Sequence, residues 1–165
     1  MATKDYSNKQ ESLIADYLGW DRVAASGARD FEKGDIKSDD WLVEAKTHET
    51  ETKITFNYKV WEKIQQEAMV LHKTPVLIVD DGTQNINHTW CLFSAHLIPA
   101  TCNRFSLYAL LGNKVGKSNI NCTHEFLADI YRYREPNCIG TTDWNHNRVA
   151  IIPIENFKFG ILEQK

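Results

Sequence analysis

Residues 34–47, Gly-Asp-Ile-Lys-Ser-Asp-Asp-Trp-Leu-Val-Glu-Ala-Lys-Thr, form the stretch that decides the fold. Residues 41–47 have the composition of a strand, with an apolar run that leads into Glu44. Residues 38–40, Ser-Asp-Asp, are typical of a turn, and residues 34–36 precede them as a short second segment. The stretch therefore predicts a β-hairpin.

The predicted hairpin brings charged side chains together. Glu44 and Lys46 are two residues apart in a strand, so their side chains emerge side by side, while Val43 and Ala45 face the other way. A loop of two or four residues would place Asp35 diagonal to Glu44 or directly opposite it, on the same face. A three-residue loop without a bulge would place Asp35 on the other face.

The flanking segments indicate the rest of the fold. Ser7 and Gln10 have the form of a capping box before helical apolar spacing, and Asn57 is predicted to cap a second helix that ends near residue 73. Residues 76–79, Val-Leu-Ile-Val, have the pattern of a strand buried on both faces. This order predicts an α/β fold with a mixed central β-sheet flanked by helices.

The last third of the chain is less regular. Residues 112–123 are rich in Gly, Lys and Asn and predict an exposed loop, followed by a helix over 125–134 and a strand over 149–154. A length of 165 residues fits one domain. We predict a single domain, with a core at about 7–95 and a C-terminal elaboration at about 96–165.

The composition, 42% hydrophobic and 25% charged, is that of an ordinary soluble globular protein. The polar first residues predict no targeting segment, and no apolar run approaches the roughly 18 residues needed to cross a bilayer. A net charge of −3 decides little about nucleic-acid binding. The four cysteines lack a CxxC motif and are expected to be free thiols. A zinc site remains open, because the cysteines and histidines include enough ligands, although their spacings fit no standard zinc pattern: Cys102, Cys122, His124, Cys138 and His146.

Two carboxylates beside an ammonium suit phosphodiester hydrolysis. Asp35 and Glu44 can bind Mg²⁺ while leaving positions for water and a substrate phosphate. Lys46 beside the metal can orient or deprotonate the attacking water and neutralise charge. The alternative is an ordinary cross-strand Glu–Lys pair on a sheet surface.

Four segments together resemble the PD-(D/E)xK nuclease superfamily: Gly34-Asp35-Ile36, Leu42-Val43-Glu44-Ala45-Lys46-Thr47, Glu62-Lys63-Ile64 and Pro75-Val76-Leu77-Ile78-Val79. The sequence looks closest to archaeal and phage Holliday-junction resolvases and related phage endonucleases. The resemblance implies a restriction-endonuclease-like core and metal-dependent cleavage that leaves 5′-phosphate and 3′-hydroxyl ends. It also implies that the protein is located in the cytoplasm of a prokaryotic cell or of a phage-infected host.

The resemblance implies roles for individual residues. Asp35 and Glu44 would be metal ligands, helped by the backbone carbonyl of Ala45, and Lys46 would orient the water. Members of the resolvase branch carry an acidic residue in the first helix, which Glu11 matches. Independently, Glu11 precedes two apolar helical positions by three and seven residues, which places it near the inward stripe.

The sequence departs from the family at two points. Gly34 stands where the superfamily has proline, and residues 58–61 lack the glutamine that many members carry after the lysine. The candidates for substrate contacts in its place are Lys59, Lys63 and Gln66. Ser26 and Arg29 lie in the turn where related enzymes meet the phosphate backbone, with an ordinary turn as the alternative.

The leading hypothesis is a Mg²⁺-dependent endodeoxyribonuclease that prefers branched DNA, with Mn²⁺ able to substitute. Symmetric cutting of a four-way junction predicts a homodimer. One alternative is a nuclease with another specificity, such as a nickase, a restriction-type enzyme or a DNA-degrading enzyme. The other is a DNA-binding protein that keeps the nuclease fold without turnover.

Overall fold

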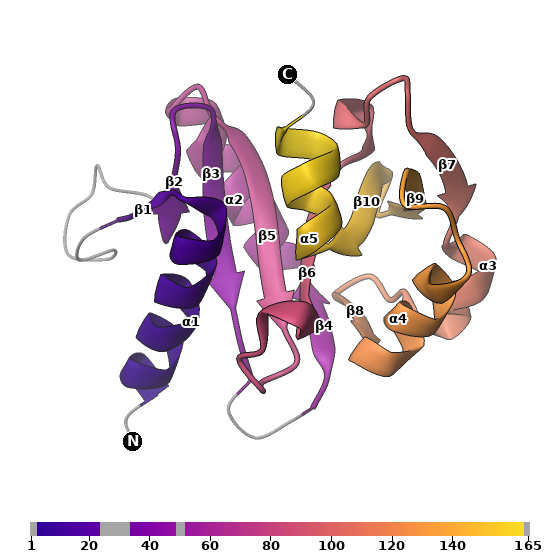
Figure 1. The fold of residues 1–165 in the computed structure, drawn as a ribbon, viewed down its shortest axis with the longest axis horizontal. Coiled ribbons are helices and arrows are strands. Elements are labelled where there is room, and N and C mark those ends of the chain that lie inside the picture. Colours follow the sequence, from indigo (N-terminus) through magenta and orange to yellow (C-terminus); the bar gives the residue numbers. More distant parts are fainter. Residues whose placement is uncertain (1–2, 24–33, 49–51, 164–165) are drawn as a thin grey trace.

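A mixed β-sheet runs through the centre of the computed structural model, which describes residues 3–23, 34–48 and 52–163 (Figure 1). Within these ranges the sheet has eight strands, in the order β1-β2-β3-β5-β6-β10-β9-β7. Their bounds, in that order, are Asp21–Arg22, Ile36–Lys37, Trp41–Lys46, Thr74–Asp80, Thr89–Ser94, Asn147–Pro153, Cys138–Trp144 and Asn103–Ser106. The pairs β3–β5 and β7–β9 are parallel and the other neighbours are antiparallel, so the predicted mixed α/β sheet is confirmed.

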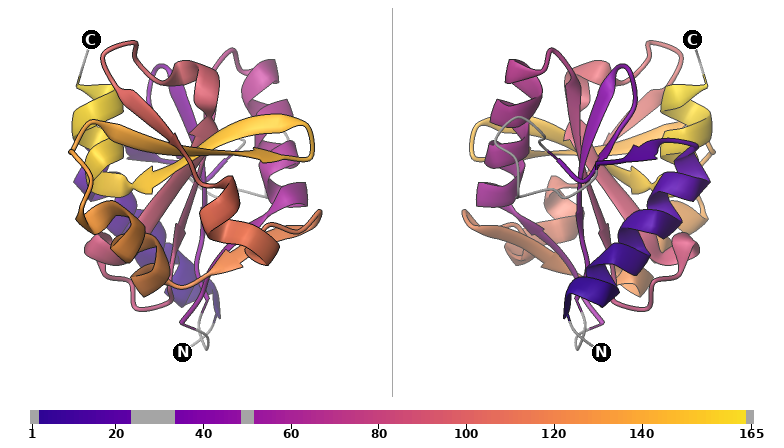
Figure 2. Two further views of the ribbon diagram at one scale, coloured as in Figure 1. Left: turned by 90° about the vertical axis from the view of Figure 1, so that its right-hand side faces the viewer. Right: turned by 90° about the vertical axis from the view of Figure 1, so that its left-hand side faces the viewer.

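Helices cover both faces of this sheet. Figure 2 shows α1 and α5 on one side and α2 on the other. The bounds of the helices are Thr3–Leu18 for α1, Tyr58–Val70 for α2, Tyr108–Leu111 for α3, His124–Arg132 for α4 and Ile154–Asn156 for α5, which continues as a π-helical segment over Phe157–Leu162. In the part of the chain that the structure describes, no helix is long and apolar enough to cross a membrane.

The β2–β3 hairpin has a short connection and a local break in its ladder at Asp35. Ile36 pairs with Val43 and Lys37 with Leu42, and the Ser38 N–H donates to the Trp41 carbonyl at 3.0 Å. The Asp35 N–H donates to the Val43 carbonyl at 2.8 Å, although Val43 is already the partner of Ile36. The regular ladder therefore ends before Asp35, and the loop length considered from the sequence does not decide the side on which Asp35 lies.

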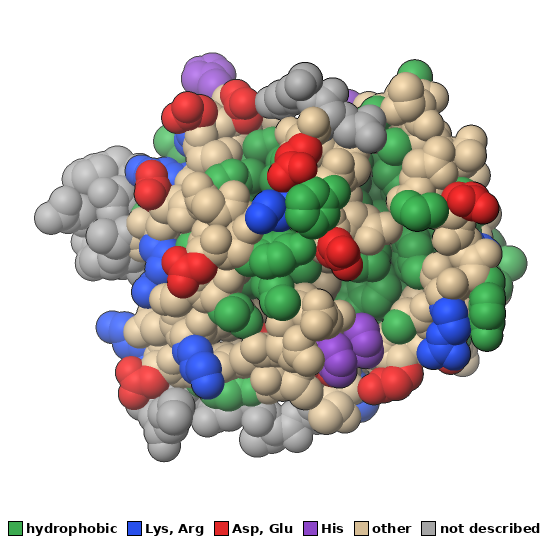
Figure 3. Space-filling view, viewed as in Figure 1, with side chains coloured by type: hydrophobic (Ala, Val, Ile, Leu, Met, Phe, Trp, Pro, Cys, Tyr) green, Lys and Arg blue, Asp and Glu red, His purple; other side chains and the backbone are tan. Residues whose placement is uncertain are grey.

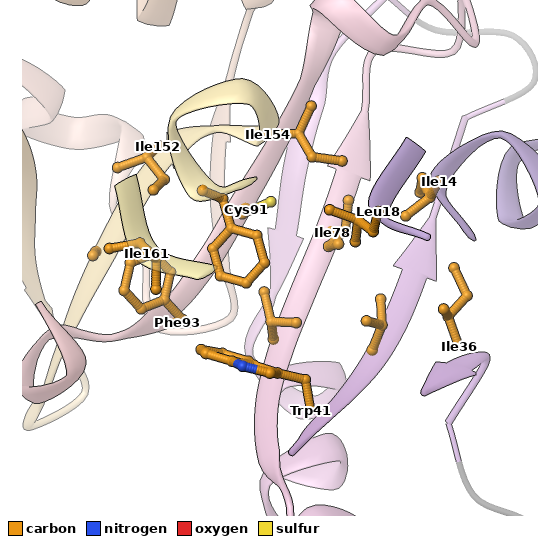
Figure 4. Packing of buried hydrophobic residues seen from close by; sticks show 14 of the residues in the cluster. Ile14, Leu18, Ile36, Trp41, Ile78, Cys91, Phe93, Ile152, Ile154 and Ile161 are labelled. Atoms are coloured by element: carbon orange, nitrogen blue, oxygen red, sulfur yellow. The ribbon is translucent and has the colours of Figure 1, made fainter. Parts of the chain in front are cut away.

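Side chains alternate between two apolar clusters on the two faces of the sheet. On β3 and β5, Val43 and Ile78 join a cluster with α1 and α5, part of which is drawn in Figure 4. Leu42 and Val79 join the other cluster, which contains the buried residues of α2. Residues 76–79 are fully buried, as predicted for a strand covered on both faces. Because Leu42 shares its face with Glu44 and Lys46, these two charged residues lie on the α2 side.

The predicted helices are confirmed with shifted ends. The first helix begins at Thr3, so Ser7 and Gln10 do not form its capping box. Asn57 caps α2 as predicted, since its Oδ1 accepts a hydrogen bond from the Val60 N–H at 3.2 Å. The helix ends at Val70, a turn earlier than predicted.

The prediction of an exposed loop over 112–123 is wrong for its second half. Residues Asn119–Cys122 form β8, which pairs with β4 (Ile54–Asn57) in a separate two-stranded sheet. Ile120 and Cys122 are buried while Asn119 and Asn121 are exposed. This strict alternation is a strand pattern, but only two of the four residues are apolar, and the polar flanks concealed it.

Candidate functional site

Asp35, Glu44 and Lys46 meet at the edge of the sheet where β2 pairs with β3. The Lys46 Nζ lies 2.8 Å from Oε1 of Glu44, whose side chain is largely buried. The carboxylate of Asp35 reaches across the hairpin, where its Oδ2 accepts a hydrogen bond from the Ala45 N–H at 2.8 Å. The hairpin therefore fixes two carboxylates and one ammonium beside each other.

Burial and nearby charges shift the pKa values of Asp35 and Lys46. Burial and the nearby charge of Glu44 raise the pKa of Asp35 to about 7, with a further contribution from Glu11, although the Ala45 N–H acts against the shift. Burial acts to lower the pKa of Lys46, but the charge and hydrogen bond of Glu44 outweigh it, so the pKa is raised. Lys46 is therefore protonated at neutral pH, and Asp35 is near its midpoint.

The first helix contributes Glu11 to the same neighbourhood. The charge of Glu11 contributes to the raised pKa values of both Asp35 and Lys46. Its Oε2 is 3.0 Å from the guanidinium of Arg22. Glu11 is thus held by one cation at the margin of the carboxylate cluster.

Sequence reasoning missed the role of Gln10. Its Nε2 donates to the Lys46 carbonyl at 2.6 Å, which ties α1 to the end of β3, and its buried Oε1 has no partner among the described residues. The side chain is almost fully buried. The only sequence signal was a polar residue next to Glu11, which we assigned to the helix cap.

A second missed group lies at the end of β5. Asp80 is buried, and its Oδ1 accepts from the Thr47 hydroxyl at 2.5 Å and from the Gly82 N–H at 3.1 Å. Burial raises the pKa of Asp80. Asp80 directly follows the apolar run, and parallel β3 and β5 end at the same edge of the sheet. The sequence could therefore have predicted a carboxylate near the end of β3.

Gly34 shapes the approach of Asp35 to β3. It has a φ of +74°, and an added Cβ would lie 2.7 Å from Cδ1 of Leu42 and 3.1 Å from the Val43 carbonyl oxygen. Its N–H donates to Oε2 of Glu67 on α2 at 3.2 Å. Glycine is therefore required both by the left-handed backbone and by the close packing on β3.

We expect Gly34→Ala to lower the free energy of unfolding by about 1–3 kcal/mol, because the backbone must leave its conformation or Leu42 must move. Urea unfolding monitored by circular dichroism measures this loss. Gly160→Ala is the matched control, since an added Cβ there meets nothing within 4 Å. Equal stability of the two variants would contradict the steric argument.

The predicted substrate-binding residues are placed as follows. Lys59 and Lys63 are exposed on α2, and the Nζ of Lys63 lies 3.6 Å from Oε1 of Glu67. Glu67 also accepts from the Gly34 N–H, which links this face of α2 to the hairpin. Ser26 and Arg29 lie outside the described residues.

The carboxylates of Asp35 and Glu44 are of the kind that binds a hard cation which takes few of its ligands from the protein. Within residues 3–23, 34–48 and 52–163, no three His, Cys, Asp or Glu side chains are arranged to hold one metal ion. Two carboxylates are the usual protein contribution to a Mg²⁺ site, where water and phosphate complete the coordination. Burial and the charge of Glu44 raise the pKa of Asp35, and a bound divalent cation would relieve the repulsion between the two carboxylates. The donor chemistry of Asp35 and Glu44, two carboxylates, is therefore compatible with the expected ion. The four cysteines are free, and the described residues bring together no zinc site.

Comparisons of the chain with protein-family models, with curated proteins and with solved structures gave no match.

Proposed function

We propose that the chain is a Mg²⁺-dependent endodeoxyribonuclease that hydrolyses phosphodiester bonds. The observation that carries this proposal is the convergence of Asp35, Glu44 and Lys46. Lys46 Nζ lies 2.8 Å from Oε1 of Glu44, and Oδ2 of Asp35 accepts at 2.8 Å from the N–H of Ala45, the residue between them. A surface Glu–Lys pair would need neither the buried setting of Glu44 nor a second carboxylate beside it. Two carboxylates and a cation form the set that phosphodiester hydrolysis requires.

The proposal gives these residues two roles, which are to bind the metal ion and to orient the attacking water. Asp35 and Glu44 would hold Mg²⁺ together with the Ala45 carbonyl, and Glu11 adds negative charge nearby. When bound, the ion offsets charge on the phosphate oxygens and lowers the pKa of a coordinated water. Lys46 carries a proton, so it is suited to hold the attacking water by a hydrogen bond and to stabilise negative charge that develops in the transition state.

The finer assignment of the fold is part of the same proposal. The order α1, β2–β3 hairpin, α2, β5, with β5 parallel to β3, agrees with the restriction-endonuclease-like core expected for PD-(D/E)xK nucleases. We assign the chain to the resolvase-like branch of that superfamily on its sequence motifs. Branched DNA as substrate and a homodimer that cuts symmetrically belong to this assignment.

The test compares a fluorescently labelled four-way junction with a linear duplex, each incubated with the full-length protein in Mg²⁺ or in EDTA. We expect Mg²⁺-dependent cleavage with faster cutting of the junction. Equal cutting of both substrates would refute the junction preference and leave the nuclease assignment intact. Binding that is unchanged by EDTA, with no cleavage of any DNA, would instead indicate a non-catalytic DNA-binding protein.

A further inference from the structure

A polar hollow lies at the start of β8, in the part of the chain that follows the predicted core. Its volume is about 510 Å³, and its lining includes Lys114 and Lys117 together with three asparagines, Asn113, Asn119 and Asn121. No Asp or Glu lines this hollow, which we call the basic hollow, although the chain as a whole has a net charge of −3. In the described part of the chain, neither lysine forms an ion pair with a carboxylate, and the Lys114 Nζ lies over the ring of Phe126, 4.5 Å from its centroid.

The backbone around the basic hollow is held by hydrogen bonds to its carbonyl groups. The Trp144 Nε1 donates to the Gly116 carbonyl at 2.9 Å, and the Asn145 Nδ2 donates to the Lys117 carbonyl at 2.6 Å. The Gly116 N–H donates to the Asn119 carbonyl at 2.8 Å. These carbonyl acceptors are engaged by the protein, and Oδ1 of Asn121 accepts from the Thr55 hydroxyl at 3.2 Å. The donors that the lining offers to a ligand are ammonium groups and the NH₂ groups of side-chain amides.

The basic hollow adjoins the face of the sheet that carries the candidate site. The Tyr58 N–H at the start of α2 donates to the Ser118 carbonyl at 2.9 Å, and the exposed Lys59 follows Tyr58 in the chain. The β4–β8 sheet buries Phe56 and Ile120 in the same cluster as Leu42. Since Leu42, Glu44 and Lys46 point to one face of β3, the two-stranded sheet lies on the side of Glu44 and Lys46.

We propose that the basic hollow binds the phosphodiester backbone of nucleic acid, with Lys114 and Lys117 as the charged contacts. Phosphate oxygens accept from ammonium and amide donors without regard to base sequence, and this set of donors without a carboxylate matches that chemistry. On the face of the molecule that carries α1 and α5, Lys and Arg are interspersed with Asp and Glu (Figure 3). The contribution of this surface to cleavage rests on the proposed function, whereas binding itself can be measured without turnover.

The test uses the full-length protein with a labelled duplex and a labelled four-way junction, in Ca²⁺ without Mg²⁺, with EDTA added in a parallel series. Affinity is measured by fluorescence anisotropy at several salt concentrations. We expect Lys114→Ala/Lys117→Ala to weaken binding roughly tenfold and to reduce the slope of log K against log salt by about 1–2, because each phosphate contact releases about one counterion. Lys114→Arg/Lys117→Arg should keep the affinity of the wild type, since the positive charge remains.

A matched control makes the outcome decisive. Lys4→Ala/Arg132→Ala removes the same charge from exposed positions on α1 and α4, and it should change the affinity and the salt slope much less. Cleavage by the wild type, with unchanged binding and salt slope in the Lys114→Ala/Lys117→Ala variant, would overturn this inference alone. Salt-dependent binding that requires both lysines, without any cleavage, would support the basic hollow and refute the nuclease function.

Discussion

Lys46→Met is expected to reduce the rate of Mg²⁺-dependent cleavage by roughly 10²–10⁴-fold, the range typical for loss of a positioned group that acts in the transition state. The reason is local: Lys46 Nζ is 2.8 Å from Glu44, and its raised pKa keeps it charged where negative charge would develop. Methionine retains the length of the side chain and removes only the ammonium group. Single-turnover cleavage of a labelled four-way junction measures the loss.

Binding distinguishes a role in the reaction from a role in folding. The Lys46→Met variant should bind the junction in Ca²⁺ within a few-fold of the wild type, because the change removes one ammonium from a side chain that is 47% exposed and leaves both carboxylates in place. Arg132→Met is a control for the loss of an exposed cation, since Arg132 pairs with Asp129 on α4 and is 60% exposed. A near-normal cleavage rate in Lys46→Met would show that the proposed active site is wrong.

The core of the fold could be predicted because its signals are local. The apolar run at 76–79 predicted a strand buried on both faces, and the structure places it in β5 with full burial. Asn57 predicted the start of α2, since an Asx side chain before an amphipathic stretch satisfies a free helical N–H. In each case the residues that decide the structure are neighbours in the chain.

The C-terminal third could be predicted only in part because its partners are distant. Residue Ile54 of β4 pairs with Cys122 of β8, a contact that no local pattern announces. The strand β9 was missed because Gly140 and two threonines interrupt its apolar residues. Gly140 is needed there, since an added Cβ would lie 2.7 Å from the Leu107 side chain. Tertiary packing, rather than local propensity, selects these strands.

The candidate site, too, could be predicted only where its contacts are between neighbours in the chain. Strand alternation sufficed to pair Glu44 with Lys46, which the structure places 2.8 Å apart. The position of Asp35 could not be predicted from loop length, because its N–H donates to the Val43 carbonyl although Val43 is the partner of Ile36. Gln10 and Asp80 reach β3 from α1 and β5, so their contacts depend on how the elements pack and were not predicted.

The second large effect concerns metal binding and pH. Asp35 has a pKa of about 7 in the metal-free protein, raised by burial and by Glu44, so it must lose a proton before it binds a cation. We expect the affinity for Mg²⁺ or Mn²⁺ to rise by up to tenfold per pH unit below about pH 7 and to level off above it. Between pH 7 and pH 5 the affinity should thus fall by about 100-fold at most. Isothermal titration calorimetry with Mn²⁺ across this range measures the change.

The Asp35→Asn variant tests whether Asp35, rather than a neighbouring carboxylate, is the group whose titration controls metal binding. The variant should bind Mn²⁺ weakly and with little pH dependence between pH 5 and pH 7, whereas Asp21→Asn, at an exposed position on β1, should behave as the wild type.

The pH dependence of the free energy of unfolding is an independent test of the same titration. Because the folded-state pKa of Asp35 lies above its ordinary value of 3.8, the folded protein holds a proton that the unfolded chain releases. The metal-free wild type should therefore lose stability as the pH rises from about 4 to about 7, and Asp35→Asn should lose less over the same range. A wild-type metal affinity that does not vary with pH, together with identical stability profiles for wild type and Asp35→Asn, would mean that Asp35 is not the titrating ligand.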